Sequence, residues 1–110
     1  MPPGKNAPNY FAVAKLTDIK PDYPIRVRVG RHDVALIKID GEIFAIDNIC
    51  THSYVSLADG FVNGDIIECP LHGACFNIRT GKVVSPPATV DLKTYAVRIE
   101  GDDVLVGWAT

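Results

Sequence analysis

The sequence has few of the features that mark exported, membrane-bound or nucleic-acid-binding proteins. No apolar run approaches the roughly 20 residues that a membrane-spanning helix needs, and residues 1–8 contain no apolar secretory core. Basic residues are not in excess, because 11 Lys and Arg stand against 13 Asp and Glu, for a formal net charge of −2. We therefore expect a soluble cytoplasmic protein that binds neither nucleic acid nor a membrane.

Cysteine is also scarce, and an odd number of three cannot pair completely. In a chain without an export signal, Cys close to His suggests a metal site rather than a disulfide framework. Long helical periods, internal repeats and low-complexity segments are absent as well. The length of 110 residues and a hydrophobic content of 47% indicate one ordinary domain over residues 1–110, with residues 1–8 as a flexible lead-in.

Short β-prone segments follow one another along the chain, separated by Gly, Asp, Asn and Pro. Residues 24–29 alternate between apolar and basic side chains, which is typical of a half-buried strand. The dipeptide Asp40-Gly41 lies between two apolar segments and favours a two-residue hairpin turn. The pattern predicts an all-β fold, a small antiparallel β-sandwich. We expect its strands at residues 10–14, 24–29, 34–39, 42–46, 74–78, 82–84, 94–100 and 104–108. Residues 61–68 should form either a strand pair around Asn63-Gly64 or a short strand after it.

Two short arms each carry one thiol and one imidazole. Cys50 and His52 form the first arm, and Cys69 and His72 form the second. Each arm follows an apolar run, so we expect both to be loops at one end of the β scaffold, a common place for functional residues. Thiolates and imidazoles are ligands for zinc and for iron–sulfur clusters.

Both kinds of metal centre are compatible with this ligand set. A structural Cys2His2 zinc site usually takes its cysteines from one knuckle and its histidines from a helix. Here each arm mixes one Cys with one His, and no helix is predicted. A [2Fe–2S] cluster can place two thiolates on one iron and two imidazoles on the other, with each arm supplying one ligand to each iron. The spacing favours the cluster, and a structural zinc module for protein interaction stays open as an alternative.

The pattern C-T-H-x16-C-P-L-H-G resembles the Rieske motif, C-x-H-x15–17-C-x2-H. The resemblance implies that Cys50 and Cys69 bind one iron of a [2Fe–2S] cluster and that His52 and His72 bind the other. It extends over about residues 8–108 and is greatest to the small Rieske ferredoxins of bacterial aromatic-ring dioxygenase systems.

The resemblance also implies the layout of the site. Cluster-binding loops are expected at about residues 47–57 and 67–77, and a Pro-containing loop that shields the cluster at 85–88. The implied protein is a monomeric one-electron carrier and not an enzyme. It would accept electrons from an NAD(P)H-dependent flavoprotein reductase and pass them to a terminal oxygenase. The alternative within the family is a small subunit of a nitrite or arsenite oxidoreductase.

Four positions differ from the high-potential Rieske proteins of respiratory chains. Those proteins carry two further cysteines, which form a disulfide, and a Ser and a Tyr whose hydroxyls bond to sulfur. Because such hydrogen bonds favour the more negative reduced cluster, their absence lowers the reduction potential. We expect the low end of the family range, which spans about −150 to +300 mV. The corresponding residues here are Val55, Leu71, Ala74 and Phe76.

Further residues near the two arms receive simpler interpretations. We expect His32 to be a solvated turn residue and Cys75 to be a thiol outside the ligand set. Gly73 should permit a backbone turn, and a further hypothesis is that this turn brings the Gly73 N–H towards a cluster sulfur. Apolar residues in or beside the loops should cover the cluster and form a docking patch for redox partners: Tyr54, Leu71, Pro86 and Pro87. Three acidic residues form either an acidic rim that steers partners or, more simply, a solvated face: Asp59, Asp65 and Glu68.

Overall fold

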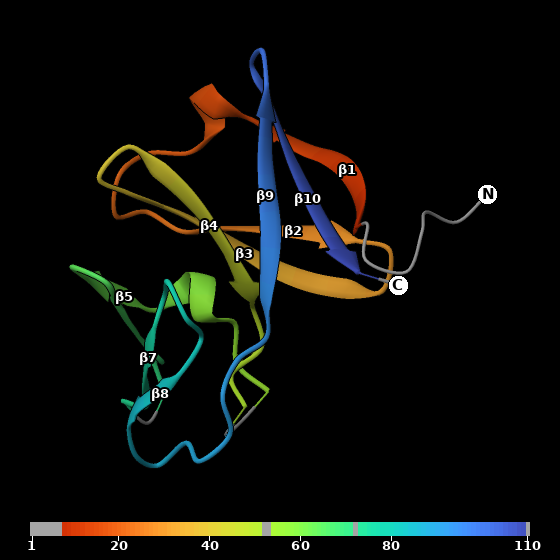
Figure 1. Ribbon diagram of the computed structural model, residues 1–110. Coiled ribbons are helices and arrows are strands. Elements are labelled where there is room, and N and C mark those ends of the chain that lie inside the picture. The colour runs from red at the N-terminus through yellow and green to blue at the C-terminus, as the bar shows by residue number, and fades with distance from the viewer. Residues whose placement is uncertain (1–7, 52–53, 72, 110) are drawn as a thin grey trace.

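The computed structural model describes residues 8–51, 54–71 and 73–109, so the lead-in expected at residues 1–8 falls outside it except for Pro8. The described residues form two antiparallel sheets, which confirms the all-β prediction (Figure 1). Their only helical elements are two 3-10 turns, η1 (Leu16–Asp18) and η2 (Leu57–Asp59). Neither is long enough or apolar enough to cross a membrane.

The larger sheet has six strands in the order β1-β10-β9-β4-β3-β2. It curls so that its edge strands β1 and β2 approach each other, which gives the upper lobe of Figure 1 a barrel-like form. Every pairing within it is antiparallel. Its strands are β1 (Pro8–Lys15), β2 (Ile25–Val29), β3 (His32–Ile39), β4 (Glu42–Asp47), β9 (Thr94–Glu100) and β10 (Asp103–Ala109).

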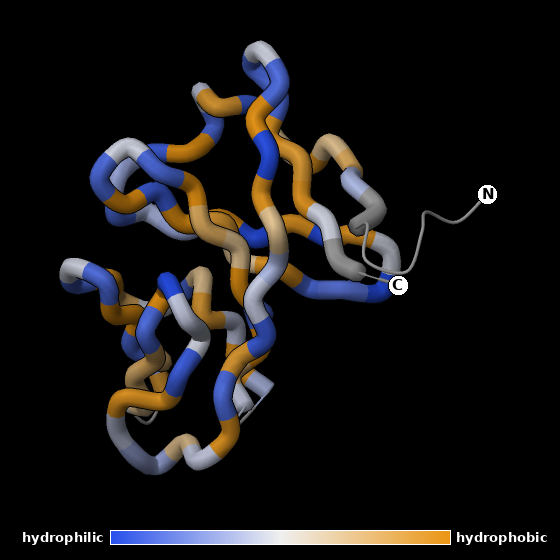
Figure 2. Tube along the Cα trace, viewed as in Figure 1, coloured by the Kyte–Doolittle hydropathy of each residue, from blue (hydrophilic) through white to orange (hydrophobic). Residues whose placement is uncertain are grey.

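The smaller sheet has four strands in the order β5-β6-β7-β8 and forms the lower lobe. The strand pair predicted within residues 61–68 is a hairpin, in which Asn63 pairs with Ile66 across the turn at Gly64-Asp65. Hydrophilic residues occupy the hairpin tips in both lobes (Figure 2), as expected for solvated turns. The strands of the smaller sheet are β5 (Phe61–Asn63), β6 (Ile66–Glu68), β7 (Cys75–Asn77) and β8 (Val83–Ser85).

Strand β3 separates two hydrophobic cores. Val34 and Leu36 face the core inside the barrel. Ala35 and Ile37 point to the opposite side and pack against the small sheet and the segments around it. Because side chains alternate across a strand, both faces of β3 are buried, and this explains its nearly continuous apolar sequence. The small sheet is thereby fixed to the barrel through a shared apolar wall.

His32 is not the solvated turn residue that we expected. The turn after β2 is short, so His32 already pairs with Val29 as the first residue of β3. Its Nδ1 atom lies 3.2 Å from the Tyr95 hydroxyl, and the two rings meet edge to face. The same hydroxyl donates a hydrogen bond to Asp47. Burial and this bond raise the pKa of Tyr95 well above its usual value.

Asp65 also differs from expectation, because it is not simply solvated. Its carboxylate lies 3.0 Å from Nε of Arg79, which follows β7. The Arg79 guanidinium lies 4.9 Å from the ring centre of Phe44 in β4. The Arg79 guanidinium also lies 3.5 Å from the carboxylate of Asp40, in the turn between β3 and β4. Arg79 therefore joins the small sheet to the barrel through this second ion pair and the cation–π contact.

Candidate metal centre

Two loops with the same backbone closure project from the strands around the lower lobe. In loop 1 (residues 50–55), the Cys50 N–H donates to the Val55 carbonyl at 3.0 Å. In loop 2 (residues 69–74), the Cys69 N–H donates to the Ala74 carbonyl at 2.8 Å, at the same separation along the chain. Each cysteine therefore opens a loop that its own main chain closes. The two similar arms of the sequence therefore form two loops that are closed by the same type of backbone hydrogen bond.

Both cysteine side chains face the interior. Cys50 is 3% exposed and Cys69 is 1% exposed, and they belong to one buried cluster together with Leu57, Ile67 and Phe76. A buried charge must be paired or bound to a metal, so two thiolates here require a cationic partner. Two soft donors from two loops, inside one apolar cluster, fit the thiolate half of an iron–sulfur centre.

The two predicted imidazole ligands, His52 and His72, lie outside the described residues. The part of the chain that the structure describes contains no group of three or more Cys, His, Asp or Glu side chains arranged to hold a metal. The structure thus places the two cysteines of the predicted set and leaves the histidines as a prediction from the motif.

Loop 2 turns at Gly73, which has a φ of 75°. A side chain would strain this left-handed conformation. Its N–H donates to the Cys69 carbonyl at 3.2 Å, so the loop's own turn uses the donor that we had considered for a cluster sulfur. Cys75 lies just beyond loop 2 in β7, with Sγ 3.4 Å from the Gly73 carbonyl.

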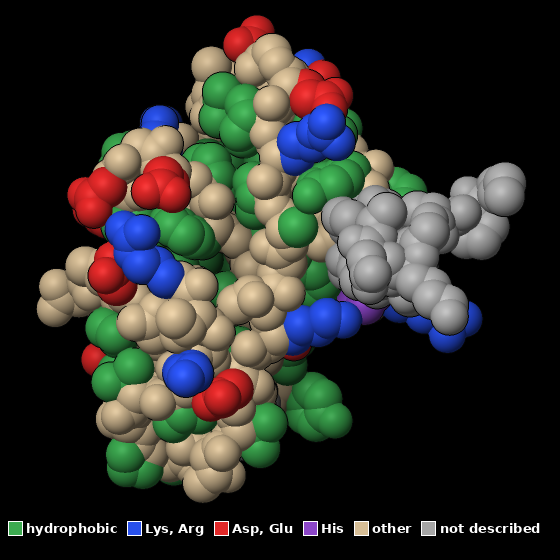
Figure 3. Space-filling view, in the orientation of Figure 1, with side chains coloured by type: hydrophobic (Ala, Val, Ile, Leu, Met, Phe, Trp, Pro, Cys, Tyr) green, Lys and Arg blue, Asp and Glu red, His purple; other side chains and the backbone are tan. Residues whose placement is uncertain are grey.

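Exposed apolar side chains surround the two loops. Tyr54 in loop 1 is 99% exposed and Leu71 in loop 2 is 58% exposed. The Thr51 hydroxyl donates to the Val90 carbonyl at 2.6 Å, which holds the segment after the Pro loop beside loop 1. On the face drawn in Figure 3, one basic and one acidic side chain lie on the lower lobe. The surface from these two side chains to the tip of the lobe shows no charged side chain. The apolar residues exposed here are Tyr54, Leu71, Val84, Pro86, Pro87 and Val90.

Sequence reasoning missed Val84 and Val90 of this group and also missed Asn48. The valines lie on either side of the Pro loop, and their neighbours in sequence gave no sign of exposure. Asn48 is fully buried at the base of loop 1. Its position directly after an apolar strand and two residues before Cys50 was the available signal, since a polar residue that ends a buried strand often bonds to neighbouring backbone.

An all-β domain with two cysteine-headed loops and a His in each loop defines a mixed Cys/His metalloprotein. A sequence profile of the Rieske [2Fe-2S] domain matches residues 9–96, and the chain belongs to this family. It therefore carries a Rieske-type [2Fe–2S] cluster, which replaces the zinc alternative.

Similar proteins of known type extend along most of the chain. The ferredoxin component of naphthalene 1,2-dioxygenase/salicylate 5-hydroxylase systems from a Ralstonia species is 43% identical over 98 residues, covering 89% of this chain and 94% of that protein. The Sphingomonas yanoikuyae B1 ferredoxin superposes with a TM-score of 0.86 at 37% identity, covering 91% of this chain and 99% of the other. A chain in the complex of reduced oxygenase and oxidised ferredoxin in carbazole 1,9a-dioxygenase superposes with a TM-score of 0.83 at 36% identity, covering 89% and 92%.

Proposed function

We propose that this protein is the ferredoxin component of an aromatic-ring dioxygenase system, an electron carrier and not the catalyst. The similarity to such ferredoxins over nearly the full length of both chains carries the proposal. The electron acceptor is a terminal oxygenase, and the existence of an oxygenase–ferredoxin complex for a similar chain supports this partner. The donor is an NAD(P)H-dependent flavoprotein reductase.

The four ligands that we propose are Cys50 and Cys69 on one iron and His52 and His72 on the other. When bound, the cluster supplies one-electron redox chemistry. The chain supplies the environment. The burial of Cys50 and Cys69 among apolar side chains keeps water from the thiolates, and the two closing backbone bonds hold both loops at fixed width.

We place the reduction potential at the low end of the family range, at about −150 mV. Ala74 and Phe76 are both fully buried, and neither can donate a hydrogen bond to sulfur. Redox titration followed by electron paramagnetic resonance tests this value. Ala74→Ser adds one hydroxyl at the end of loop 2 and should raise the midpoint by about 40 mV if it donates a hydrogen bond of about 1 kcal/mol to sulfur. Ala45→Ser is a matched control, because Ala45 is buried in the barrel core instead.

We infer that the exposed apolar residues around the loops form the docking surface for both partners. Tyr54, Leu71 and the prolines extend this surface from loop 1 across loop 2 to the Pro loop. Tyr54→Ala should slow electron transfer to the oxygenase and leave the cluster spectrum unchanged. Phe11→Ala is the control, because Phe11 is an exposed aromatic residue on β1 of the other lobe. Equal transfer rates in the two variants would contradict the assignment.

Reconstitution tests the function as a whole. Purified protein is combined with a flavoprotein reductase, NADH and candidate aromatic-ring oxygenases, and product formation is followed. We expect product only when this ferredoxin is present. A large subunit that copurifies stably with the chain would instead favour an oxidoreductase small subunit.

A further inference from the structure

Asn48 has the only fully buried polar side chain among the residues that the structure describes. It lies between the end of β4 and loop 1. Its Nδ2 group donates to Ser56 Oγ at 2.8 Å and to Asp33 Oδ1 at 3.1 Å. Its Oδ1 atom accepts from the Ala58 N–H at 2.9 Å and from Ser56 Oγ at 3.1 Å. The amide thus uses both of its hydrogens and both acceptor positions.

These bonds join the two ends of loop 1. Asn48 precedes the loop, whereas Ser56 and Ala58 follow it. The main chain of Asn48 adds to the connection, since its carbonyl accepts from the Leu57 N–H at 2.7 Å. The isolated bridge between Ile49 and Ser56 lies between these contacts and the loop. The side chain of Asn48 therefore adds to the main-chain bonds that hold the two ends of loop 1 together.

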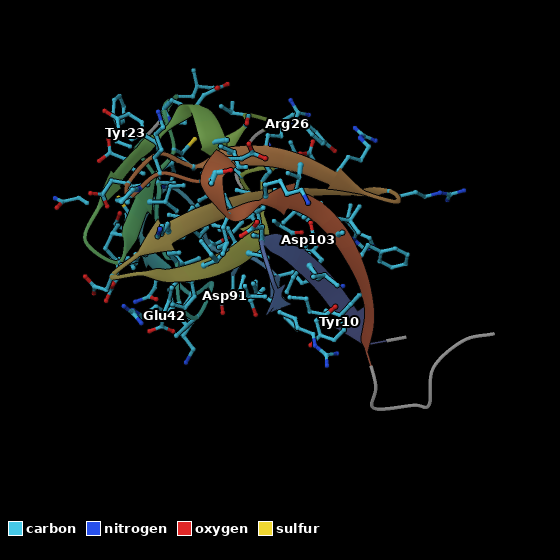
Figure 4. All side chains as sticks on the ribbon, turned by 90° about the horizontal axis from the view of Figure 1, so that it is seen from above. Tyr10, Tyr23, Arg26, Glu42, Asp91 and Asp103 are labelled. Carbon is cyan, nitrogen blue, oxygen red and sulfur yellow. The ribbon has the colours of Figure 1, made fainter. Side chains whose placement is uncertain are left out.

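The chain of contacts continues into the barrel. The Asn48 N–H donates to the Asp33 carbonyl at 2.8 Å, in addition to the side-chain bond. The Asp33 carboxylate accepts two bonds from Arg26 on β2, of which the Nε bond is 2.9 Å long. Arg26 lies at the rim of the molecule in Figure 4. Loop 1 is thus tied to the edge strand of the barrel through Asn48, Asp33 and Arg26.

We propose that Asn48 is a positioning residue for the cluster, which holds loop 1 at the width needed for Cys50 and His52 to bind together. The inference rests on the proposed ligand set. Within the described residues the Asn48 side chain bonds to Asp33, Ser56 and Ala58 and not to Cys50, so it acts through the ends of the loop. Loss of its amide removes one hydrogen-bond partner from the Ala58 N–H and from the Asp33 carboxylate, both of which belong to partly buried residues.

The test compares two asparagines in the holoprotein. Asn48→Leu removes the amide at nearly constant size. Asn77→Leu is the matched control, because the Asn77 Oδ1 also accepts two hydrogen bonds, at 2.9 and 3.1 Å from backbone N–H groups, but at the end of β7 away from loop 2. We measure the rate of cluster loss to an iron chelator, the electron paramagnetic resonance spectrum of the reduced protein, and the free energy of unfolding. Asn48→Leu should lose the cluster about tenfold faster or more, the range seen when outer partners of a metal site are removed.

A matching set of variants separates positioning from general destabilisation. Asn48→Asp places a second carboxylate against Asp33, so it should release the cluster fastest. The double variant Asn48→Asp with Asp33→Asn again places an amide donor against a carboxylate at these two positions. It should therefore release the cluster more slowly than Asn48→Asp alone. Ser56→Ala should release the cluster faster than Ser56→Thr, which keeps the hydroxyl. This second pair serves as the test if the Asn48 variants fail to fold.

The outcomes are distinct. Faster cluster loss and an altered spectrum in Asn48→Leu, with neither in Asn77→Leu, support the proposal. Wild-type cluster lifetime in both Asn48→Leu and Ser56→Ala overturns it, as does equal cluster loss in Asn48→Leu and Asn77→Leu variants of equal stability. If the wild-type protein itself shows no Rieske spectrum, the proposed ligand set fails instead.

Discussion

Loop 1 and loop 2 have the same backbone closure, yet different interactions hold their ends in place. The ends of loop 1 are joined by the polar side chains of Asn48 and Ser56, with Asp33 behind them. The ends of loop 2 continue directly into β6 and β7, where Ile67 and Phe76 pair and are fully buried. One loop is therefore fixed by hydrogen bonds and the other by packing.

The difference follows from where each loop sits in the fold. Loop 2 is the connection of a hairpin, so the ladder on both sides sets the distance between its ends. Loop 1 leaves the barrel at β4 and leads to η2 of the other lobe, and no ladder joins its ends beyond one bridge. A side-chain network takes the place of the ladder. The same ligand geometry thus requires different residues on the two sides.

Substitution of the two cysteines that we propose as ligands tests whether the two loops are equivalent. It should have the largest effect of all the changes, because it removes a ligand of the cluster. Cys50→Ala and Cys69→Ala should each abolish the cluster, because each removes one of the two thiolates that we propose for the same iron. Alanine suits these buried positions, since free cysteine packs as a small hydrophobic residue. Visible absorption and iron content of the purified variants provide the measurement. Cys75→Ala should keep the cluster, and a cluster retained in either ligand variant would refute the proposed set.

The packing of loop 2 is tested most strongly at Phe76. Phe76→Ala should lower the free energy of unfolding by about 3–5 kcal/mol, because it leaves a cavity in the core next to Cys69. Phe61→Ala provides the control in the same sheet, since Phe61 is 64% exposed and surface changes usually stay within about 0.5 kcal/mol. Chemical denaturation of both variants gives the comparison. Similar losses in the two would mean that packing does not anchor loop 2.

The segments that flank the two loops approach each other closely at Gly60. Gly60 ends η2 after loop 1, and a Cβ built there would lie 2.1 Å from the carbonyl oxygen of Glu68, which precedes loop 2. Its φ is −89°, so the constraint is the close approach alone. Gly60→Ala should cost about 1–3 kcal/mol, as overpacking does, and Asp59→Ala should cost little. A Gly60→Ala variant with wild-type stability would show that the segments after loop 1 and before loop 2 are not in rigid contact.

The difference between loop 1 and loop 2 explains which parts of the fold and of the metal site could be predicted from the sequence. The strands follow from alternation and from turn dipeptides such as Asp40-Gly41, which are local signals. The Cys and His positions follow from a motif with short internal spacing. Strand pairing alone brings together Arg26, Asp33 and Asn48, which come from β2, β3 and the end of β4. No local sequence pattern predicts their contacts. His32 was misjudged for the same reason, since its partner Tyr95 lies on β9.

Acid provides the smallest expected effect, and it should act through the hydrogen bonds behind loop 1. The hydrogen bonds from Arg26 are the largest cause that lowers the pKa of Asp33, and the Asn48 amide and the charges of Arg26 and Arg28 lower it further, against desolvation by burial. A carboxyl group with a lowered folded pKa stabilises the protein above its unfolded value of about 3.9, and this contribution is lost as the pH falls through the folded pKa.

Asp33→Asn should therefore destabilise the protein at neutral pH by less than about 1 kcal/mol, because Arg26 is half exposed. The difference from the wild type should shrink as the pH falls below about 4. Denaturation curves of both proteins between neutral pH and pH 3 provide the measurement. A difference that stays constant or grows in acid would show that the ionised carboxylate does not support loop 1, and that the neutral hydrogen bonds of Asn48 hold it alone.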